Sequence, residues 1–317
     1  GLDMDIFKGL VQMNLSYYRK KTVDLVNNMT IPSSTGFTTY KDNIGEVMNK
    51  GVEIQLRSTI LNTKDWMVSL FANLAHNKNE ILKISNSLKD YNSKVLALYD
   101  NYKRGDESFA DTHLQYVEGG ALTSIFAVPS LGINPADGRE VFVKRDGSLT
   151  YNWNAADQIV VGNEEPKAQG TFGLNLRWKH FTLYSTFMYE FGGQRYNSTL
   201  VSRVESASIS SENVDRRVWT GRWQNVGDRT PYSKLQAEMV DTTRPTSRFV
   251  QDYNILSFNS LTLGYDFNTS WLKKYHLGML RLELSGNDLC RTSTVLLERG
   301  LDYPYSRSFA ISLKMSL

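Results

Sequence analysis

Hydrophobic and polar residues alternate without interruption over the last nine residues of the chain. Phe309, Ile311, Leu313, Met315 and Leu317 take every second position, and small or polar residues take the positions between them. Successive side chains of an extended strand point to opposite faces, so this segment is predicted to be a strand with one apolar and one polar face. A strand that has lipid on one side and water on the other shows this pattern.

The same alternation recurs along the chain. Further apolar stripes begin at Val11, Val52, Trp66, Phe172, Leu261 and Leu280. Large charged residues stand in the middle of these segments, where a dry core could not hold them unpaired. We therefore expect one set of side chains to face lipid: Leu174, Leu176, Leu261, Leu263, Leu280, Leu282, Ile311 and Leu313. We expect the opposite set to face a wet lumen: Arg177, Asp266, Arg281, Glu283 and Lys314.

The predicted strands are joined by connections of two kinds. Strands are expected near 2–8, 10–26, 45–60, 65–78, 113–128, 139–145, 170–179, 181–196, 250–267, 279–287 and 307–317. Short turns are expected near 61–65 and 179–180, and long loops at about 27–44, 79–112, 146–169, 197–250 and 286–306. Short turns on one side and long loops on the other are typical of outer-membrane barrels.

Composition agrees with a barrel. No stretch approaches the roughly 18 consecutive apolar residues of a membrane helix, so a membrane could be crossed only by a closed set of strands. The chain holds 17 Tyr and 6 Trp, many of them near predicted strand ends. That placement suits aromatic girdles at the membrane interfaces, although aromatic residues are also favoured in strands generally.

Net charge, cysteine content and the first residue of the sequence narrow the classes of protein further. The net charge of +3 is too small to indicate nucleic acid as a partner. The single Cys290 allows no internal disulfide. Because the sequence begins at Gly1 without Met or a signal peptide, we expect a processed or excised piece.

No catalytic chemistry is indicated. His76, His113, His180 and His276 are scattered without metal-binding spacing, so neither a metal nor a cofactor is expected. The Asp-Gly pairs at 137–138 and 146–147 lack the other acidic ligands of a calcium loop and are predicted to be turns. A nucleophile elbow and a phosphate loop are also missing, so the chain is predicted not to be an enzyme.

Ligand binding is predicted for the longest loop, 197–250. Its candidate substrate-binding residues are Trp219, Arg222, Trp223, Asp228 and Tyr232. Aromatic rings stack on sugars while charged groups bond hydroxyls, and the same set suits peptides almost as well. The alternative is that Arg216, Trp219 and Trp223, at helical spacing, pack a loop helix against the rim of the barrel.

Several motifs together resemble SusC/RagA-type TonB-dependent transporters. They are NKGVE at 49–53, GINPADGRE at 132–140, SRFVQDYN at 247–254, GNDL at 286–289 and ERGLDYP at 298–304. Their order and spacing cover nearly the whole chain. One departure is Leu317, since the family usually ends in an aromatic residue that serves barrel assembly.

The resemblance implies an all-β fold: a transmembrane antiparallel barrel of 22 strands, of which this chain supplies about half. The N-terminal plug and the first strands would lie in another portion that pairs with this one. The implied function is import of a glycan or oligopeptide through the outer membrane of a Bacteroidetes-type Gram-negative cell. The implied partners are a SusD-like surface lipoprotein and TonB, which acts through the plug.

Two other classes stay open from the residues alone. One is an outer-membrane barrel enzyme such as a hydrolase, which would need a Ser/His/Asp set that is not apparent. The other is a surface-binding β protein without transport, which would need strands that lack lipid-facing stripes. A hydrolase assay would separate the barrel enzyme from the importer, and the dependence of solubility on detergent would separate the surface-binding β protein from the importer.

Overall fold

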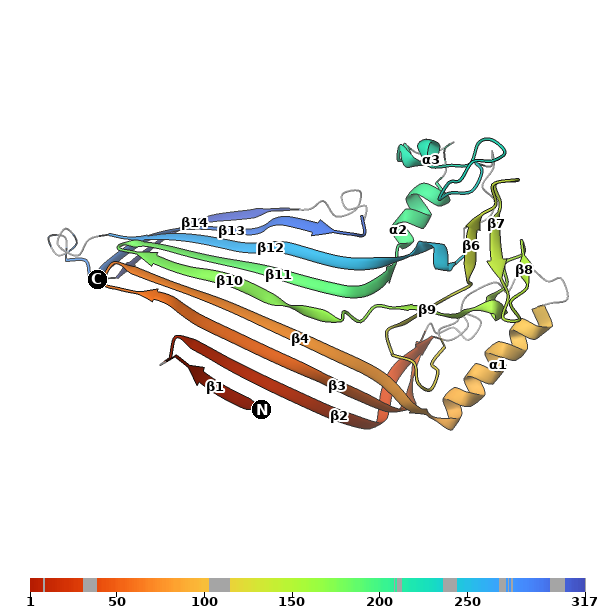
Figure 1. The fold of residues 1–317 in the computed structure, drawn as a ribbon, viewed down its shortest axis with the longest axis horizontal. Coiled ribbons are helices and arrows are strands. Elements are labelled where there is room, and N and C mark those ends of the chain that lie inside the picture. Colours follow the sequence, from red (N-terminus) through yellow and green to blue (C-terminus); the bar gives the residue numbers. More distant parts are fainter. Residues whose placement is uncertain are drawn as a thin grey trace.

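The computed structural model describes residues 1–7, 9–30, 39–102, 115–207, 209, 213–235, 244–267, 272, 274, 276–296 and 306–316. Nine strands form one sheet in which all neighbours are antiparallel, in the order β1-β2-β3-β4-β10-β11-β12-β13-β14 (Figure 1). Their bounds are β1 Leu2–Ile6, β2 Val11–Thr30, β3 Thr39–Asn62, β4 Trp66–Ile84, β10 Ala168–Trp178, β11 Phe181–Tyr196, β12 Val250–Asp266, β13 Met279–Ser293 and β14 Ser308–Ser316. The predicted all-β antiparallel fold is confirmed.

The two ends of this main sheet differ. At one end, which we call the turn end, strands are joined through 7–10, 63–65, 179–180 and 267–278. Thr63 closes one of these turns, because its amide donates to the Trp66 carbonyl at 2.7 Å and its hydroxyl accepts from the Trp66 amide at 3.1 Å. At the other end, the loop end, the connections include 85–167 and 197–249, and these carry the helices and short strands seen around α1, α2 and α3 in Figure 1.

Several strands are longer than predicted. β2 continues to Thr30 and β3 begins at Thr39, so 27–30 and 39–43 of the expected loop 27–44 are paired strand. β13 likewise continues to Ser293, past the end predicted at 287. Pairing needs only backbone groups, so the ladder extends beyond the apolar stripes from which the strands were predicted.

Two predicted barrel strands, 113–128 and 139–145, are not in the main sheet. Residues 113 and 114 lie outside the described part of the chain. Within the rest of the two segments, the strands are only β5 (Ser124–Ala127) and β7 (Glu140–Val143). β5 pairs with β9 (Ile159–Asn163), and β7 lies between β6 (Ser130–Ile133) and β8 (Leu149–Thr150). Four residues are too few to cross a membrane, which takes about 9–11. β4 therefore pairs directly with β10.

A helix occupies part of the predicted loop 79–112. The helix α1 (Asn86–Tyr102) begins after Ser85, whose hydroxyl accepts from the Leu88 amide at 3.1 Å and so caps the first turn. Leu88 is buried against Val47 and Ile81 of the strands below it. This packing, rather than helix propensity, holds α1 against the loop end.

One face of the main sheet is apolar across its strands, and we call it the apolar face. Leu176, Leu183, Leu263, Leu284 and Ile311 stand in register across β10 to β14. Leu174 pairs with Leu70, Leu280 with Met315, and Leu282 with Leu313, while Leu261 takes alternate positions with Leu263. All eight residues predicted to face lipid therefore share this face. It stays uncovered in the described chain, where Leu313 is 65% exposed.

Aromatic side chains form a row at each margin of the apolar face. At the turn end the rings of Trp66 and Trp178 are 5.5 Å apart, those of Trp178 and Phe181 5.9 Å, and those of Phe181 and Tyr265 4.7 Å. The second row holds Phe172, Phe187, Phe258, Tyr189 and Phe191, with Phe187 and Phe258 4.5 Å apart. Phe181 and Phe191 are the first and eleventh residues of β11. Ten steps span roughly 34 Å of strand, or about 26 Å across a membrane at a tilt of about 40°.

The opposite, polar face holds the predicted lumen charges, four of which bind one another. Arg281 bonds Asp266 at 3.1 Å and Glu283 at 3.3 Å, and Lys314 bonds Glu283 at 2.9 Å. Arg177 lies on the same face, because its register partner Thr182 accepts a hydrogen bond from Arg281 at 2.7 Å. Because these four charges are paired, none of them is buried as an isolated charge.

In the described chain no helix is both long enough and apolar enough to span a membrane.

Candidate binding site

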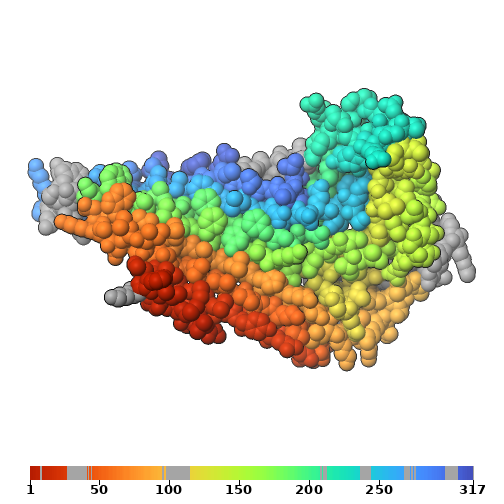
Figure 2. All heavy atoms as spheres, viewed as in Figure 1, coloured from red at the N-terminus to blue at the C-terminus, as the bar shows by residue number. Residues whose placement is uncertain are grey.

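Two segments far apart in the sequence pack into one body at the loop end, the loop layer, which comprises the described residues of 115–167 and 197–249. Figure 2 shows this body as a mass of yellow-green and teal atoms at one end of the molecule. The Val128 amide donates to the Pro245 carbonyl at 3.2 Å, and the Ser247 amide returns a bond to Val128 at 3.0 Å. The Trp153 indole N–H donates to the Pro245 carbonyl at 3.1 Å. Backbone bonds thus join the two segments directly.

The second segment begins with a capped helical stretch. Asn197 accepts from the Leu200 amide at 2.9 Å and starts α2 (Ser198–Leu200), which runs on as a π-helix, η4 (Val201–Glu205). A short helix α3 (Arg217–Thr220) and a 3-10 turn η5 (Ser247–Phe249) follow. Side chains from these elements and from the residues between them form one core: Leu200, Val201, Val204, Ala207, Val218, Tyr232 and Phe249.

A buried ion triad ties three parts of the loop layer. Arg248 bonds Glu140 of β7 and Glu205 of η4, both at 2.8 Å, and its side chain is only 10% exposed. A further N–H of Arg248 donates to the Pro231 carbonyl at 2.6 Å. Burial acts to lower the pKa of Arg248, but the bonds and charges of the two glutamates outweigh burial, so the pKa is raised. Arg248 therefore stays a cation.

Arg222 and Tyr232, both predicted to bind substrate, lie inside the loop layer. Arg222 is 3% exposed and donates to the carbonyl groups of Ser233 at 3.0 Å and Glu205 at 2.5 Å, and also to that of Val204. Burial lowers the pKa of Arg222, and the charge of Glu205 opposes that shift. Tyr232 is buried in the core described above, and burial raises the pKa of its hydroxyl. Both side chains organise the layer from within.

Trp223 and Asp228 lie nearer the surface and also make internal contacts. The Trp223 indole N–H donates to the Pro135 carbonyl at 2.8 Å, and its ring lies so close to Gly138 that a Cβ there would come within 2.6 Å. Gly138 also has φ 72, so two independent reasons favour glycine at this position. Asp228 accepts from the amides of Gln224 at 3.0 Å and Asn225 at 2.8 Å, which closes a turn.

Trp219 is the predicted site residue that points outward, with 68% of its surface exposed. The five predicted residues therefore share one stretch of the loop layer, with one ring on the surface and four side chains engaged in internal contacts. Whether any of them touches cargo stays a prediction. The triad of Arg248, Glu140 and Glu205 was not foreseen, because its members are far apart in the sequence and carry no common motif.

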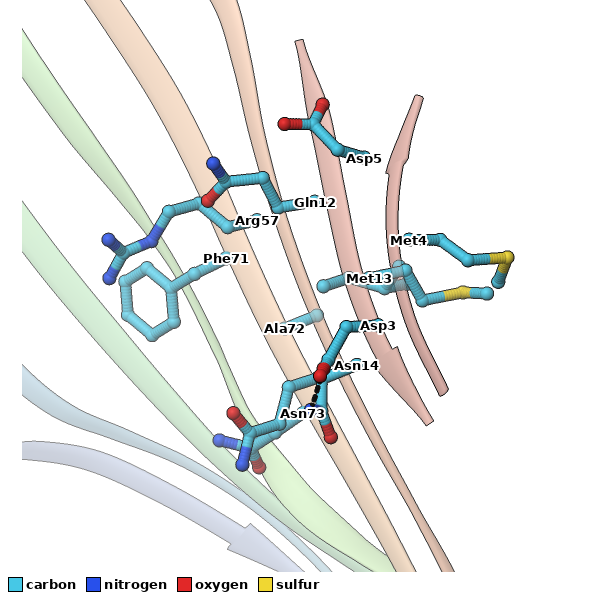
Figure 3. Close-up of a pocket in the computed structure, with 12 residues that line it drawn as sticks. Asp3, Met4, Asp5, Gln12, Met13, Asn14, Arg57, Phe71, Ala72 and Asn73 are labelled. Atoms are coloured by element: carbon cyan, nitrogen blue, oxygen red, sulfur yellow. Dashed lines mark hydrogen bonds between the residues drawn. The ribbon is translucent and has the colours of Figure 1, made fainter. Parts of the chain in front are cut away.

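The polar face also carries a groove over its first four strands. A hollow of about 560 Å³ is lined there by Asp3, Met4, Asp5, Gln12, Met13, Asn14, Gln55, Leu56, Arg57, Phe71, Ala72 and Asn73 (Figure 3). Figure 3 shows Arg57 and Phe71 projecting to one side of the strands and Met4 and Met13 to the other. The alternation predicted from the sequence thus holds at the N-terminal edge as well. Among the residues described, no three His, Cys, Asp or Glu side chains are grouped so as to hold a metal ion.

No family model matches the chain. Its sequence is 27% identical over 297 residues to the TonB-dependent receptor P3 of Formosa agariphila, covering 91% of this chain and 28% of that protein. It is 24% identical over 291 residues to the TonB-dependent receptor SusC of Bacteroides thetaiotaomicron, covering 88% of this chain and 26% of SusC. The chain thus spans little more than a quarter of the length of these relatives.

Solved structures show the same fold. The RagAB peptide transporter superposes with a TM-score of 0.73 at 20% identity, covering 98% of this chain and 34% of that one. The RagAB peptide importer in its closed-closed state gives a TM-score of 0.70 at 19% identity. The resemblance to SusC/RagA-type TonB-dependent transporters inferred from the motifs is confirmed, and the main sheet has the fold of the matching part of the RagAB structure.

Proposed function

We propose that this chain forms part of the barrel of an outer-membrane transporter that imports a glycan or an oligopeptide with energy delivered through TonB. The observation that carries this proposal is the apolar face of the main sheet, with aromatic rows at its two margins. The outermost aromatic residues of β11, Phe181 and Phe191, are about 26 Å apart across the membrane, which fits the roughly 25 Å apolar band of outer-membrane barrels. The likeness to TonB-dependent receptors supports the same conclusion.

The orientation follows from the connections. The turn end would face the periplasm and the loop end the outside of the cell, since barrels of this kind have short periplasmic turns and longer external loops. The polar face would line the lumen together with the groove of Figure 3. The remaining barrel strands and the plug would complete the lumen, and TonB would act through the plug.

The loop layer is the proposed place for cargo and partner. Trp219 offers an exposed ring that can stack on a sugar or a peptide side chain. Trp223 and Asp228 belong to the same segment of the chain, and the buried Arg222 and Tyr232 hold that segment in shape. A SusD-like surface lipoprotein would cover this end, as the likeness to the RagAB pair suggests.

The test uses the transporter as it occurs in its cell. Cells that lack the protein should lose uptake of one class of nutrient, and the protein should be extracted only from the outer-membrane fraction with detergent. Mass spectrometry of the extracted complex should identify a lipoprotein partner and a bound glycan or peptide. Recovery of the protein from the aqueous fraction, or uptake that continues without TonB, would contradict the proposal.

A further inference from the structure

Two arginine side chains on the polar face converge on one phenol oxygen close to the loop layer. Arg195 near the end of β11 donates to the Tyr253 hydroxyl at 3.1 Å, and Arg291 of β13 donates to the same oxygen at 2.7 Å. Tyr253 belongs to β12, the strand between them. The guanidinium carbon of Arg195 also lies 5.0 Å from the centre of the Tyr253 ring. Two positive charges are therefore held side by side.

A bulge in β11 places Arg195 on this face. Glu190 pairs with Ile255 and Gly193 pairs with Tyr253, so β11 contains one more residue than β12 over this interval. The extra residue reverses the alternation beyond it, which brings Arg195 to the same face as Tyr253. Gly192 permits the bulge, because it has φ 78. Without the bulge, Arg195 would point to the apolar face.

The charge environment of this pair differs from that of the other clustered arginines. Arg281 has Asp266 and Glu283 as partners, and Arg248 has Glu140 and Glu205. Within the described ranges of the chain, neither Arg195 nor Arg291 has a carboxylate at ion-pair distance. The Tyr253 oxygen accepts both of their bonds, which leaves its own O–H free to donate. Among the described residues, the cluster therefore offers hydrogen-bond donors and two positive charges that have no carboxylate partner.

We propose that Arg195, Tyr253 and Arg291 bind an anionic group of the cargo as it passes from the loop layer into the lumen. The group would be an oxyanion, namely the carboxylate of an acidic peptide or acidic glycan or the sulfate of a sulfated glycan. Guanidinium groups match such oxyanions with two parallel bonds, and an anion between the arginines removes their mutual repulsion. This inference rests on the proposed import function and narrows its cargo to molecules that carry a negative charge.

The experiment measures binding to the whole purified transporter by calorimetry. The probes are a tetraglutamate peptide, tetragalacturonate and inorganic sulfate, with maltotetraose as the neutral probe. The double variant Arg195→Gln/Arg291→Gln should bind the preferred anionic probe at least about tenfold more weakly, with a shallower dependence on salt. Tyr253→Phe, which keeps the ring and removes the hydroxyl, should give a smaller loss. Which probe is preferred distinguishes carboxylate from sulfate cargo.

The matched control is Arg177→Gln, an exposed arginine on the same face but near the turn end. It removes one positive charge from the same face and should bind every probe as the parent does. Equal melting temperatures of the variants and the parent show that each has assembled. A double variant that binds all anionic probes as tightly as the parent, or a parent that has no preference for anionic probes, overturns the inference.

Uptake by cells separates this inference from the proposed function. If the parent takes up its nutrient normally and the double variant still binds anions as the parent does, the anion site is rejected but the proposed import function is not. If the parent shows no TonB-dependent uptake but the double variant loses anion binding, the proposed import function is rejected and the anion site is supported.

Discussion

Arg248 holds the loop layer together through contacts with side chains from both of its segments. Its guanidinium binds the carboxylates of Glu140 and Glu205, which are largely buried, and also the Pro231 carbonyl. A buried pair of this kind adds little net stability over an apolar replacement of the whole set, but removal of one member leaves the others as unpaired buried charges. The effect of single substitutions here should therefore be large.

Replacement of Arg248 by Met should destabilise the loop layer by about 3–5 kcal/mol, because two buried glutamates lose their cation. Hydrogen exchange of the described parts of 197–249 should rise strongly in this variant, while the main sheet stays protected. The control is Arg229→Met, at an exposed arginine of the same layer. It should change neither the stability of the loop layer nor its hydrogen exchange. Equal exchange in the two variants would contradict the role given to Arg248.

Asp215 should make stability depend on pH in the acid range. Arg217 bonds its carboxylate at 2.7 and 2.9 Å, and these bonds lower the pKa of Asp215 from 3.8 to about 2. Because the folded pKa is the lower one, the stabilisation is fully present above about pH 4 and is lost as the pH falls towards 2. Asp215→Asn should therefore cost about 1 kcal/mol at pH 7, after allowance for solvent, and almost nothing at pH 2. Thermal unfolding at both pH values tests this; a cost independent of pH speaks against it.

Trp219 and Trp223 should respond to truncation in opposite ways. Trp223→Ala removes a ring that packs on Gly138 and bonds Pro135, so it should lower the stability of the layer by about 2 kcal/mol. Trp219→Ala removes an exposed ring, so it should leave stability unchanged and weaken cargo binding by about 2 kcal/mol. Melting temperature and cargo affinity are measured on each variant. Normal stability with weak binding in Trp223→Ala would instead make Trp223 a cargo residue.

At the scale of elements, the long strands could be read from the sequence, but the loop layer could not. Strands such as 181–196 were predicted with their observed bounds, because alternation over many residues has a period that only a strand explains. β5, β7 and α3 are four residues each, and such short segments take their structure from tertiary partners. The bulge beside Gly192 was also missed, since one extra residue leaves hardly any trace in a hydrophobic pattern.

The two faces of β12 should tolerate charge very differently. Leu263→Arg puts a cation on the apolar face, where the cost near the middle of the membrane is about 2–4 kcal/mol, so assembly in the outer membrane should fall. Thr262→Arg, one residue earlier and on the polar face, is the matched control and should assemble normally. The amount of folded protein in outer-membrane fractions is measured for both. A cysteine introduced at position 266 should react with a labelling reagent added from the lumen, and a cysteine at position 263 should not. The opposite result would show that the polar and apolar faces have been assigned the wrong way round.

At the scale of the whole molecule, the nine-stranded sheet remains open. β1 and β14 end the strand order and do not pair with each other. An open sheet leaves backbone groups unpaired along both edges, which a lipid environment does not tolerate. Further strands are needed for closure, in agreement with the fraction of its relatives that this chain covers.

Residues 1–317 produced alone should therefore form no closed barrel and transport nothing. After refolding into detergent micelles, the chain should migrate equally in heated and unheated electrophoresis samples and should be digested by protease. The full-length transporter, treated in the same way, is the positive control and should shift on heating. A protease-resistant, heat-modifiable monomer from residues 1–317 would refute this expectation.

The bonds between Val128, Pro245 and Ser247 have a consequence for how such proteins diversify. Because the two segments of the loop layer fold as one body, a change in one of them alters the surface on which the other rests. A chimera that takes only 115–167 from a relative would combine mismatched partners, whereas one that takes both 115–167 and 197–249 would move an intact unit. Natural variants with new cargo should therefore inherit the two segments together, although the 29 residues of 168–196 separate them.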